Sequence, residues 1–192
     1  MLINKKIYFI HIPRTGGQYI KGMLYNNFDN LDHNNYNRFY KDKESPHLTY
    51  PEYHEFINYI PVKHFTIVRN PLDRIISVLK IYNKLNEEKL DMMFKNQSSF
   101  NDFVNLTISN CNCNWFMPQV RFINHQTKIW KFEDKFNDEF YYWLFINLGL
   151  NVKIKEGDLS RYNKFKIKID LTNKQKQFIE NYYYQDYKIL NY

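Results

Sequence analysis

Cysteine is nearly absent from this sequence of 192 residues, which contains only Cys111 and Cys113. One intervening residue gives the two thiols poor geometry for a disulfide with each other, and no other cysteine is available as a partner. Two thiols without neighbouring His or Cys ligands do not make a zinc site either. The sequence therefore excludes disulfide-stapled and zinc-finger proteins, and it is consistent with a reducing compartment.

Long apolar runs are also missing. No stretch reaches the roughly 20 apolar residues that a membrane-spanning helix needs. The N-terminal residues Met1–Lys6 lead directly into an apolar segment, without the pattern of a signal peptide. We expect no membrane span and a cytoplasmic location.

Glycine is scarce, at 5 residues, whereas aromatic residues make up 19% and hydrophobic residues 44% of the chain. Such a composition excludes a disordered protein and supplies a large core, so we predict one domain over residues 1–192. The net charge is +7 and the sequence pI about 9.2, which favours an anionic ligand. A merely Lys-rich surface explains the charge equally well.

Two of the few glycines are adjacent, in the segment 7–24. Residues 7–12 are mostly apolar and predict a buried parallel strand, which Pro13 ends because proline cannot donate to a ladder. Helical spacing then predicts a helix that begins near Gln18, with an apolar stripe formed by Tyr19, Ile20, Met23 and Leu24.

A glycine turn that enters a helix directs unpaired N–H groups at one point, which attracts phosphate. Gly16 and Gly17 are expected to let a ligand approach the main chain. Arg14 and Thr15 are expected on the rim, with a guanidinium and a hydroxyl. A simple turn is the alternative. The Walker pattern Gly-Lys-Ser/Thr is missing, so the anion is not expected to be the β/γ-phosphates of ATP with their metal.

A second strand is predicted over residues 63–68, followed by a helix over residues 72–82 with a clear apolar stripe. Arg69 follows this strand directly, and ligands bind at the carboxyl ends of strands in open α/β sheets. Arg69 could instead be the partner of a structural ion pair. Ser77, two turns into the helix, is either a ligand contact or a solvent-facing serine.

The remaining pattern alternates strands with helices. We predict a parallel β-sheet flanked by helices, an α/β fold. Residues 25–44 suggest a loop or weak helix and residues 150–168 a basic loop. The other expected elements are a helix over residues 50–59 with a Thr49–Glu52 capping box, a helix around residues 98–106, a strand over residues 128–132 followed by Glu133, an aromatic helix over residues 137–148 ended by Gly149, and a last helix from a Thr172–Gln175 capping box to about residue 184.

Two of these segments resemble motifs of a known family. The segment His11–Gly17 resembles the 5′-phosphosulfate loop of sulfotransferases, especially the carbohydrate branch with the heparan sulfate 2-O- and 6-O-sulfotransferases. The segment Phe65–Ser77 resembles that family's 3′-phosphate motif, and His47-Leu48-Thr49 resembles the segment that carries its base. Smaller likenesses at residues 118–119, 130–133 and 183–192 extend the match over nearly the whole chain.

The resemblance implies a P-loop NTPase-like fold and transfer of a sulfuryl group from 3′-phosphoadenosine 5′-phosphosulfate (PAPS), without a metal, to an acceptor hydroxyl. A carbohydrate acceptor is implied by the branch, and no nucleic-acid partner is expected because no recognition motif is present. The implied roles are phosphosulfate binding by the amides of Thr15, Gly16 and Gly17, contact of Arg14 with the bridging oxygen, 3′-phosphate binding by Arg69 and Ser77, further nucleotide contacts by Gln18, Tyr19, Asn163 and Lys164, and general-base catalysis by His47.

The segment departs from the family at two positions. The family more often has lysine where Arg14 stands, and a hydroxyl residue where Gln18 stands, although glutamine can still donate to a phosphate oxygen. We also expect no lumenal anchor like that of the animal enzymes, so the expectation is a soluble bacterial- or virus-like relative.

Other bases and other functions stay open at this stage. His54 is expected on a solvent face, and His64 and His11 are expected to pack inside the fold. Glu133 could reach the ligand site expected at the carboxyl ends of the strands, or it could form a salt bridge. The alternative functions are a small-molecule kinase with an atypical phosphate loop, or a non-catalytic nucleotide or polyanion binder.

Overall fold

The computed structural model of the chain describes residues 1–4, 6–29, 31–32, 39–40, 43–44, 47–56, 63–81, 87–110, 114–153 and 169–192. The statements below concern these residues. The predicted site residues Asn163 and Lys164, and both cysteines, lie outside them.

A five-stranded sheet forms the centre of the described fold, with the strand order β3-β1-β2-β6-β7. The strands β2 (Ile7–Ile10), β6 (Lys63–Val68) and β7 (Lys128–Lys131) are parallel to one another. Two short strands, β1 (Leu2–Ile3) and β3 (Leu31–Asp32), extend the sheet in antiparallel pairing. The predicted α/β class with helices flanking the sheet is therefore confirmed, and the sheet is mostly rather than wholly parallel.

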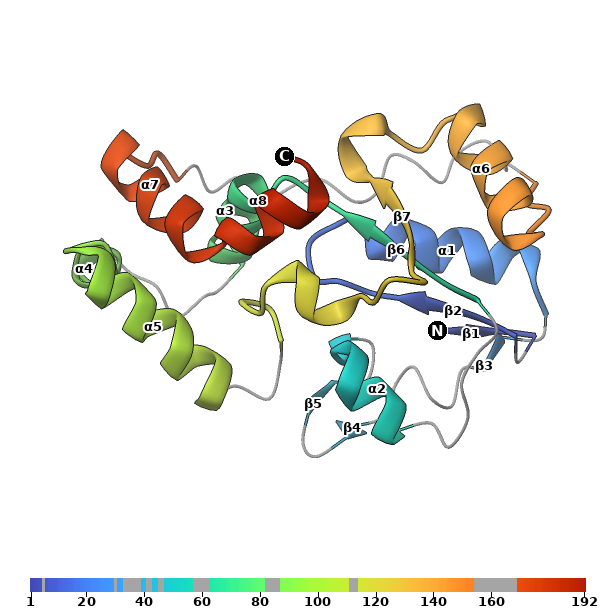
Figure 1. Cartoon of the computed structure of the whole chain (residues 1–192), viewed down its shortest axis with the longest axis horizontal. Coiled ribbons are helices and arrows are strands. Elements are labelled where there is room, and N and C mark those ends of the chain that lie inside the picture. Colours follow the sequence, from blue (N-terminus) through green and yellow to red (C-terminus); the bar gives the residue numbers. More distant parts are fainter. Residues whose placement is uncertain are drawn as a thin grey trace.

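Helices connect and cover the strands (Figure 1). Their bounds are α1 (Gly17–Asn27), α2 (Tyr50–Phe56), α3 (Pro71–Leu79), α4 (Glu87–Met93), α5 (Gln97–Asn110), η2 (Gln119–Phe122), η3 (Phe132–Asp134), α6 (Asp138–Leu148), α7 (Asn173–Tyr182) and α8 (Tyr184–Leu190). A separate two-stranded sheet pairs β4 (Phe39–Tyr40) with β5 (Lys43–Glu44).

The alternation of side chains along β2 divides the core between the two faces of the sheet. Ile7 and Phe9 pack with apolar residues of α1 and α6 on one face. Tyr8 and Ile10 pack with residues of α2, η2 and α8 on the other face. Both faces are covered, which explains why all four residues of β2 are apolar and why β6 is buried from His64 to Val68.

A third apolar cluster lies beside the sheet and is formed by α3, α4, α5 and α7. These helices occupy the left part of Figure 1. Phe100, Phe116 and Tyr183 are fully buried at its centre. Because α3 begins directly after β6, this cluster anchors the helix that follows the second predicted ligand-binding loop.

Several predicted element bounds are wrong. The first strand ends at Ile10, two residues before the predicted end at residue 12. The segment predicted as a loop or weak helix over residues 25–44 contains the end of α1 and three short strands. The helix expected around residues 98–106 runs from Gln97 to Asn110, and α4 was not predicted. The last predicted helix is divided at Tyr183 into α7 and α8.

The predictions for the helix ends agree better with the structure than the predicted element bounds do. Gly149 ends α6 in the left-handed conformation, with φ 75°. Thr172 and Gln175 form a complete capping box. At α2, the Thr49 N–H and hydroxyl both donate to the Glu52 carboxylate, and the bond from the N–H is the reciprocal half of the predicted capping box.

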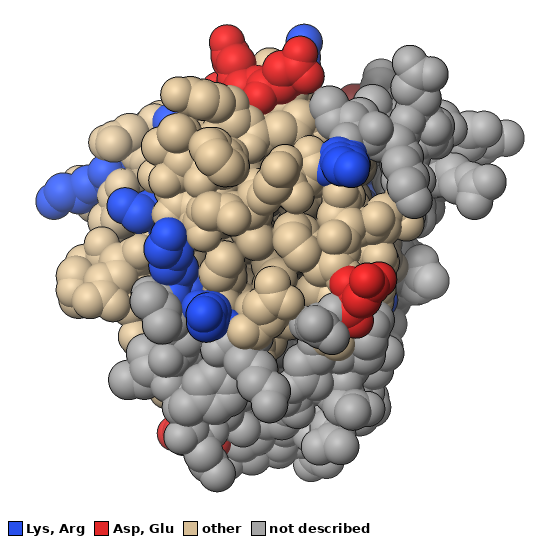
Figure 2. Space-filling view, turned by 90° about the vertical axis from the view of Figure 1, so that its right-hand side faces the viewer, with Lys and Arg blue, Asp and Glu red and all other residues tan. Residues whose placement is uncertain are grey.

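Among the described residues of the face seen in Figure 2, uncharged residues fill the centre, with charged residues of both signs around them. The helix α6, at the right of Figure 1, has exposed apolar side chains at Tyr142, Phe145 and Ile146. No helix in the described ranges has the length and apolar character that crossing a membrane would require.

Candidate functional site

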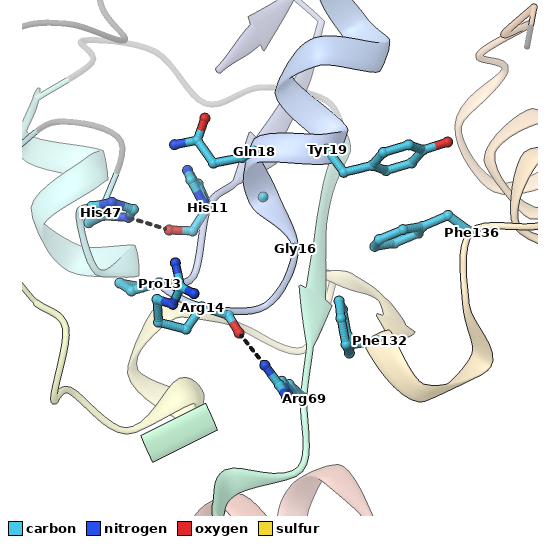
Figure 3. Close-up of a pocket in the computed structure, with 11 residues that line it drawn as sticks. His11, Pro13, Arg14, Gly16, Gln18, Tyr19, His47, Arg69, Phe132 and Phe136 are labelled. Atoms are coloured by element: carbon cyan, nitrogen blue, oxygen red, sulfur yellow. Dashed lines mark hydrogen bonds between the residues drawn. The ribbon is translucent and has the colours of Figure 1, made fainter. Parts of the chain in front are cut away.

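The carboxyl ends of β2 and β6 meet at one edge of the sheet because the two strands are parallel neighbours, with Ile10 paired to Thr66. The loops that follow them carry Arg14 and Arg69. They border a cavity of about 270 Å³ whose lining side chains converge from several elements (Figure 3). Its lining residues are His11, Pro13, Arg14, Gly16, Gly17, Gln18, Tyr19, His47, Arg69, Phe132 and Phe136.

The loop between β2 and α1 is tightly turned. Arg14 and Gly16 both have left-handed backbone conformations, with φ 67° and 92°. Thr15 lies between them, fully buried, and its hydroxyl donates to the Ile12 carbonyl at 2.9 Å. The prediction that Thr15 presents a hydroxyl on the rim is therefore wrong, because the turn directs this side chain into the loop itself.

The two glycines are needed for different reasons. A Cβ at Gly16 would lie 2.9 Å from the Phe136 ring, and the positive φ already disfavours other residues there. Gly17 has no positive φ, but a Cβ at this position would lie 1.9 Å from the His11 ring. Protein rings thus occupy the place of a side chain at both positions, while the main chain of both glycines still borders the cavity.

The N-terminus of α1 faces the cavity without any cap. Its N-cap residue is Gly16, no side chain caps the helix, and no acidic residue occurs in its first turn. The first N–H groups of a helix have no intrahelical acceptor, and the helix dipole adds partial positive charge there. Since Gly16, Gly17 and Gln18 all line the cavity, this arrangement favours an anion at that position.

Two arginines add to the positive potential of this end of the cavity. The Arg69 Nη1 donates to the Arg14 carbonyl at 3.4 Å, and the Arg14 Nε donates to the Ser77 hydroxyl at 3.1 Å. Burial, and then the charge of Arg69, lowers the pKa of Arg14. A bound anion would offset both effects, because it would replace lost hydration and screen the two cations from each other.

His47 enters the cavity from the segment before α2. Its Nδ1 lies 3.0 Å from the His11 carbonyl oxygen. A carbonyl can only accept, so Nδ1 carries the proton and Nε2 bears the lone pair of the neutral ring. Burial lowers the pKa of His47 to about 4, against an opposing effect of this hydrogen bond. His47 is therefore neutral at pH 7, with the tautomer that a general base needs.

The backbone of His47 is itself held in place. The Asn114 amide, which is buried, donates to the His47 carbonyl at 2.9 Å and to the Glu52 carboxylate at 2.7 Å. The same carboxylate accepts from Thr49 at the start of α2. His47 is thus fixed from the α2 side by a network of which the sequence predicted the Thr49–Glu52 contact but not the contacts of Asn114.

Aromatic side chains form the opposite wall of the cavity. Tyr19 stacks on Phe136 at 4.7 Å, and its hydroxyl forms a hydrogen bond with that of Tyr141. Phe136 in turn packs edge-on against Phe132, whose ring lies under the Arg69 guanidinium at 4.8 Å. The cavity therefore combines a cationic end with a flat apolar wall, which suits an anionic ligand that also carries a planar ring.

The structure brings most predicted site residues together, but not all. Arg14, Gly16, Gly17, Gln18, Tyr19, His47 and Arg69 line the cavity. Ser77 does not line it and instead contacts Arg14. Thr15 is buried behind the loop.

Of the four rival bases, His11 lines the cavity, and Glu133, His54 and His64 do not. Glu133 is not among the lining residues, because its carboxylate accepts from the Asn70 N–H and the Tyr192 hydroxyl. His64 is buried in β6, as expected, whereas His54 is half-buried rather than on a solvent face. His11 is buried too, but its ring lines the cavity, 4.5 Å from the His47 ring, which packing alone did not predict.

Four other residues important to the site were missed by sequence reasoning: His11 as the partner of His47, Asn114, and the aromatic pair Phe132 and Phe136. Two of them carried a signal, since Phe132 ends the predicted strand over residues 128–132 and His11 begins the segment that resembles the phosphosulfate loop. The others act through contacts between distant segments, which no local spacing reveals.

The left-handed conformation of Arg14 leads to a stability prediction. Both Arg14→Gly and Arg14→Ala remove the guanidinium, but only alanine retains the steric cost of a positive φ. We expect Arg14→Gly to be more stable than Arg14→Ala by about 1 kcal/mol in urea unfolding. Equal stabilities would show that the loop relaxes when the side chain is removed.

Comparison of the chain with protein-family models, with curated proteins and with solved structures found no match.

Proposed function

We propose that this protein is a sulfotransferase that moves a sulfuryl group from PAPS to an acceptor hydroxyl. The observation that carries the proposal is the arrangement of one cavity: an uncapped helix N-terminus and two arginines at one side, with a neutral His47 of defined tautomer bordering the same space. The motif resemblance supplies the identity of the nucleotide, and this geometry is compatible with it.

The residues present fit such a ligand. The N-terminus of α1 and Arg14 suit the phosphosulfate group, and Arg69 suits the second phosphate. The wall formed by Tyr19 and Phe136 provides a flat apolar surface beside them. Ser77 would act through Arg14, or would exchange that contact for one to the nucleotide.

The proposed step is an in-line displacement. The acceptor oxygen forms a bond to sulfur as the bond from sulfur to the phosphate oxygen breaks, and the acceptor proton passes to Nε2 of His47. The leaving group is adenosine 3′,5′-bisphosphate, whose developing negative charge faces Arg14 and the α1 amides. A charge-assisted hydrogen bond of this kind contributes about 1.5–3 kcal/mol.

A kinase is less well supported by the same cavity. A kinase needs a lysine near the phosphates and an acidic side chain that holds Mg²⁺. The described residues that line the cavity include neither lysine nor an acid. A non-catalytic nucleotide or polyanion binder has the same cationic end, and only turnover separates it from an enzyme.

A thermal-shift comparison tests the ligand. Adenosine 3′,5′-bisphosphate at a hundredfold excess over its Kd should stabilise the protein by about 2.7 kcal/mol, which corresponds to a Tm increase of at least about 5 °C. ATP with Mg²⁺ should give a much smaller shift. The Arg69→Ala variant should lose most of the increase, and Arg121→Ala, which removes an exposed arginine, should not.

A shift with ATP and Mg²⁺ alone would favour the kinase, and a shift with neither nucleotide would overturn the proposal. If the bisphosphate binds, release of bisphosphate from PAPS in the presence of hydroxyl acceptors separates the enzyme from a binder. The P-loop NTPase-like fold, the carbohydrate acceptor, the absence of a metal and the cytoplasmic location belong to the same proposal, and glycan mass spectrometry with and without the protein tests the acceptor.

A further inference from the structure

The Arg69 backbone forms two hydrogen bonds with the side chain of Gln119, which is 50 residues away in sequence. The Gln119 Oε1 accepts from the Arg69 N–H at 2.9 Å, and the Gln119 Nε2 donates to the Arg69 carbonyl at 2.8 Å. The last paired residues of the β6–β7 ladder are Val68 and Lys131. The Gln119 amide thus makes the hydrogen bonds to the Arg69 N–H and carbonyl that a paired strand would make. Arg69 lies one residue beyond the last paired residue of β6.

Gln119 is held just as firmly from behind. It is fully buried, and its own N–H donates to the Asp186 carboxylate at 2.9 Å, while the Val120 N–H donates to the other carboxylate oxygen at 3.0 Å. Asp186 is a buried residue of α8. A continuous chain of hydrogen bonds therefore leads from the C-terminal helix through Gln119 to Arg69.

The same segment is fixed on its carbonyl side. The buried Arg74 donates to the carbonyls of Trp115 and Met117 at 3.0 and 2.9 Å, and the Tyr183 hydroxyl donates to the Phe116 carbonyl at 2.7 Å. Gln119 consequently has little freedom to follow Arg69 if Arg69 moves. Arg69 must conform to Gln119.

We propose that Gln119 is a positioning residue, which acts through Arg69 to hold the anion-binding guanidinium toward the cavity. With its N–H and carbonyl both fixed, Arg69 keeps the backbone geometry from which its guanidinium reaches the Arg14 carbonyl and the Phe132 ring. Preorganisation of this kind lowers the conformational entropy that ligand binding would otherwise cost. The nature of the ligand rests on the proposed function, but the two hydrogen bonds between Gln119 and the Arg69 backbone do not.

The isosteric variant Gln119→Glu provides a sharp test. Its carboxylate can still accept from the Arg69 N–H, but it meets the Arg69 carbonyl with a second acceptor unless it is protonated. At pH 8 we expect adenosine 3′,5′-bisphosphate to bind at least about tenfold more weakly than to the wild type, which corresponds to about 1.4 kcal/mol. The ratio of variant to wild-type affinity should recover as the pH falls and the acid becomes a donor.

Two further variants separate positioning from charge and from loss of fold. Gln126→Glu adds the same charge at an exposed position and should bind like the wild type at every pH. Gln119→Met removes both hydrogen bonds without charge and should weaken binding with no pH-dependent recovery. Affinity is measured by calorimetry at each pH, with circular dichroism to confirm that each variant is folded.

Hydrogen exchange of the Arg69 amide gives a readout that needs no ligand. In Gln119→Met this amide should exchange at least about tenfold faster than in the wild type, relative to amides in the middle of β6. Unchanged exchange in a folded variant would overturn the inference, as would a Gln119→Glu affinity equal to that of the wild type at pH 8. If the wild type bound no bisphosphate, the proposed function would fail, and the exchange result alone would decide the role of Gln119.

Discussion

Replacement of His47 by alanine is expected to lower sulfuryl turnover by about 10²–10⁴, the usual contribution of a general base, while nucleotide affinity stays within a factor of about three. The reason is geometric. His47 reaches the cavity with Nε2 as its lone-pair nitrogen, because the His11 carbonyl holds the proton on Nδ1. The phosphate-binding groups belong to other elements and stay in place. Initial rates and calorimetry, with the exposed His125→Ala as a control, provide the measurements.

The pH dependence of wild-type turnover should follow the same residue. A base must be unprotonated, and the pKa of His47 is lowered to about 4 by burial. We expect kcat/KM to stay level from pH 7 to about 5 and to fall as the pH approaches 4, whereas an ordinary histidine would fail near 6.5. Turnover of His47→Ala close to that of the wild type would remove His47 as the base.

A fall in pH should lower the free energy of unfolding as well as the turnover. The folded-state pKa of His47 lies below its unfolded value, so the unfolded chain takes up the proton first. The free energy of unfolding should therefore decrease as the pH falls from 6.5 toward 4. The fraction of folded protein must be measured at each pH at which a rate is interpreted.

Replacement of Arg74 by methionine is expected to lower the free energy of unfolding by about 3 kcal/mol or more, because each buried carbonyl left without a donor costs about 1–3 kcal/mol. Arg74 is fully buried and donates to the carbonyls of Trp115 and Met117. Its charge also favours the ionised form of Asp186, whose pKa is raised chiefly by burial. The variant thus loses two hydrogen bonds and a compensating cation together.

Urea unfolding of Arg74→Met, compared with the exposed Arg121→Met, tests this expectation. The control should change stability by less than about 0.5 kcal/mol. A loss below about 1 kcal/mol in Arg74→Met would show that the segment 115–120 finds other donors. Such a result would also weaken the case that this segment provides a rigid support for Gln119.

The sequence predicted the two strand-to-helix junctions well because local physics determines them. Apolar runs favour buried strands, and Pro13 and Pro71 mark where the chain leaves them. Parallel pairing of β2 and β6 then brings Arg14 and Arg69 together, as the alternation of elements suggested. The family-level function stays a prediction, since the geometry is compatible with PAPS without identifying it.

Local patterns could not predict how the site is supported. The position of Thr15 in the predicted phosphate loop suggested an exposed hydroxyl, but the left-handed conformations on either side turn it toward the Ile12 carbonyl. Gln119 and Asn114 act across 50 and 67 residues of sequence on Arg69 and His47. Gln119 is held by Asp186 of α8 and Asn114 contacts Glu52 of α2, and no spacing within the chain encodes how these distant elements pack together.

The absence of a side chain at Gly17 has an evolutionary consequence. The ring of His11 fills the place of the missing Cβ, and the carbonyl of the same residue orients His47. Residues 11 and 17 should therefore covary: a homologue with a small side chain at 11 could tolerate alanine at 17, and it would keep the backbone carbonyl that orients an imidazole at 47. A profile built to find distant homologues should score columns 11 and 17 jointly.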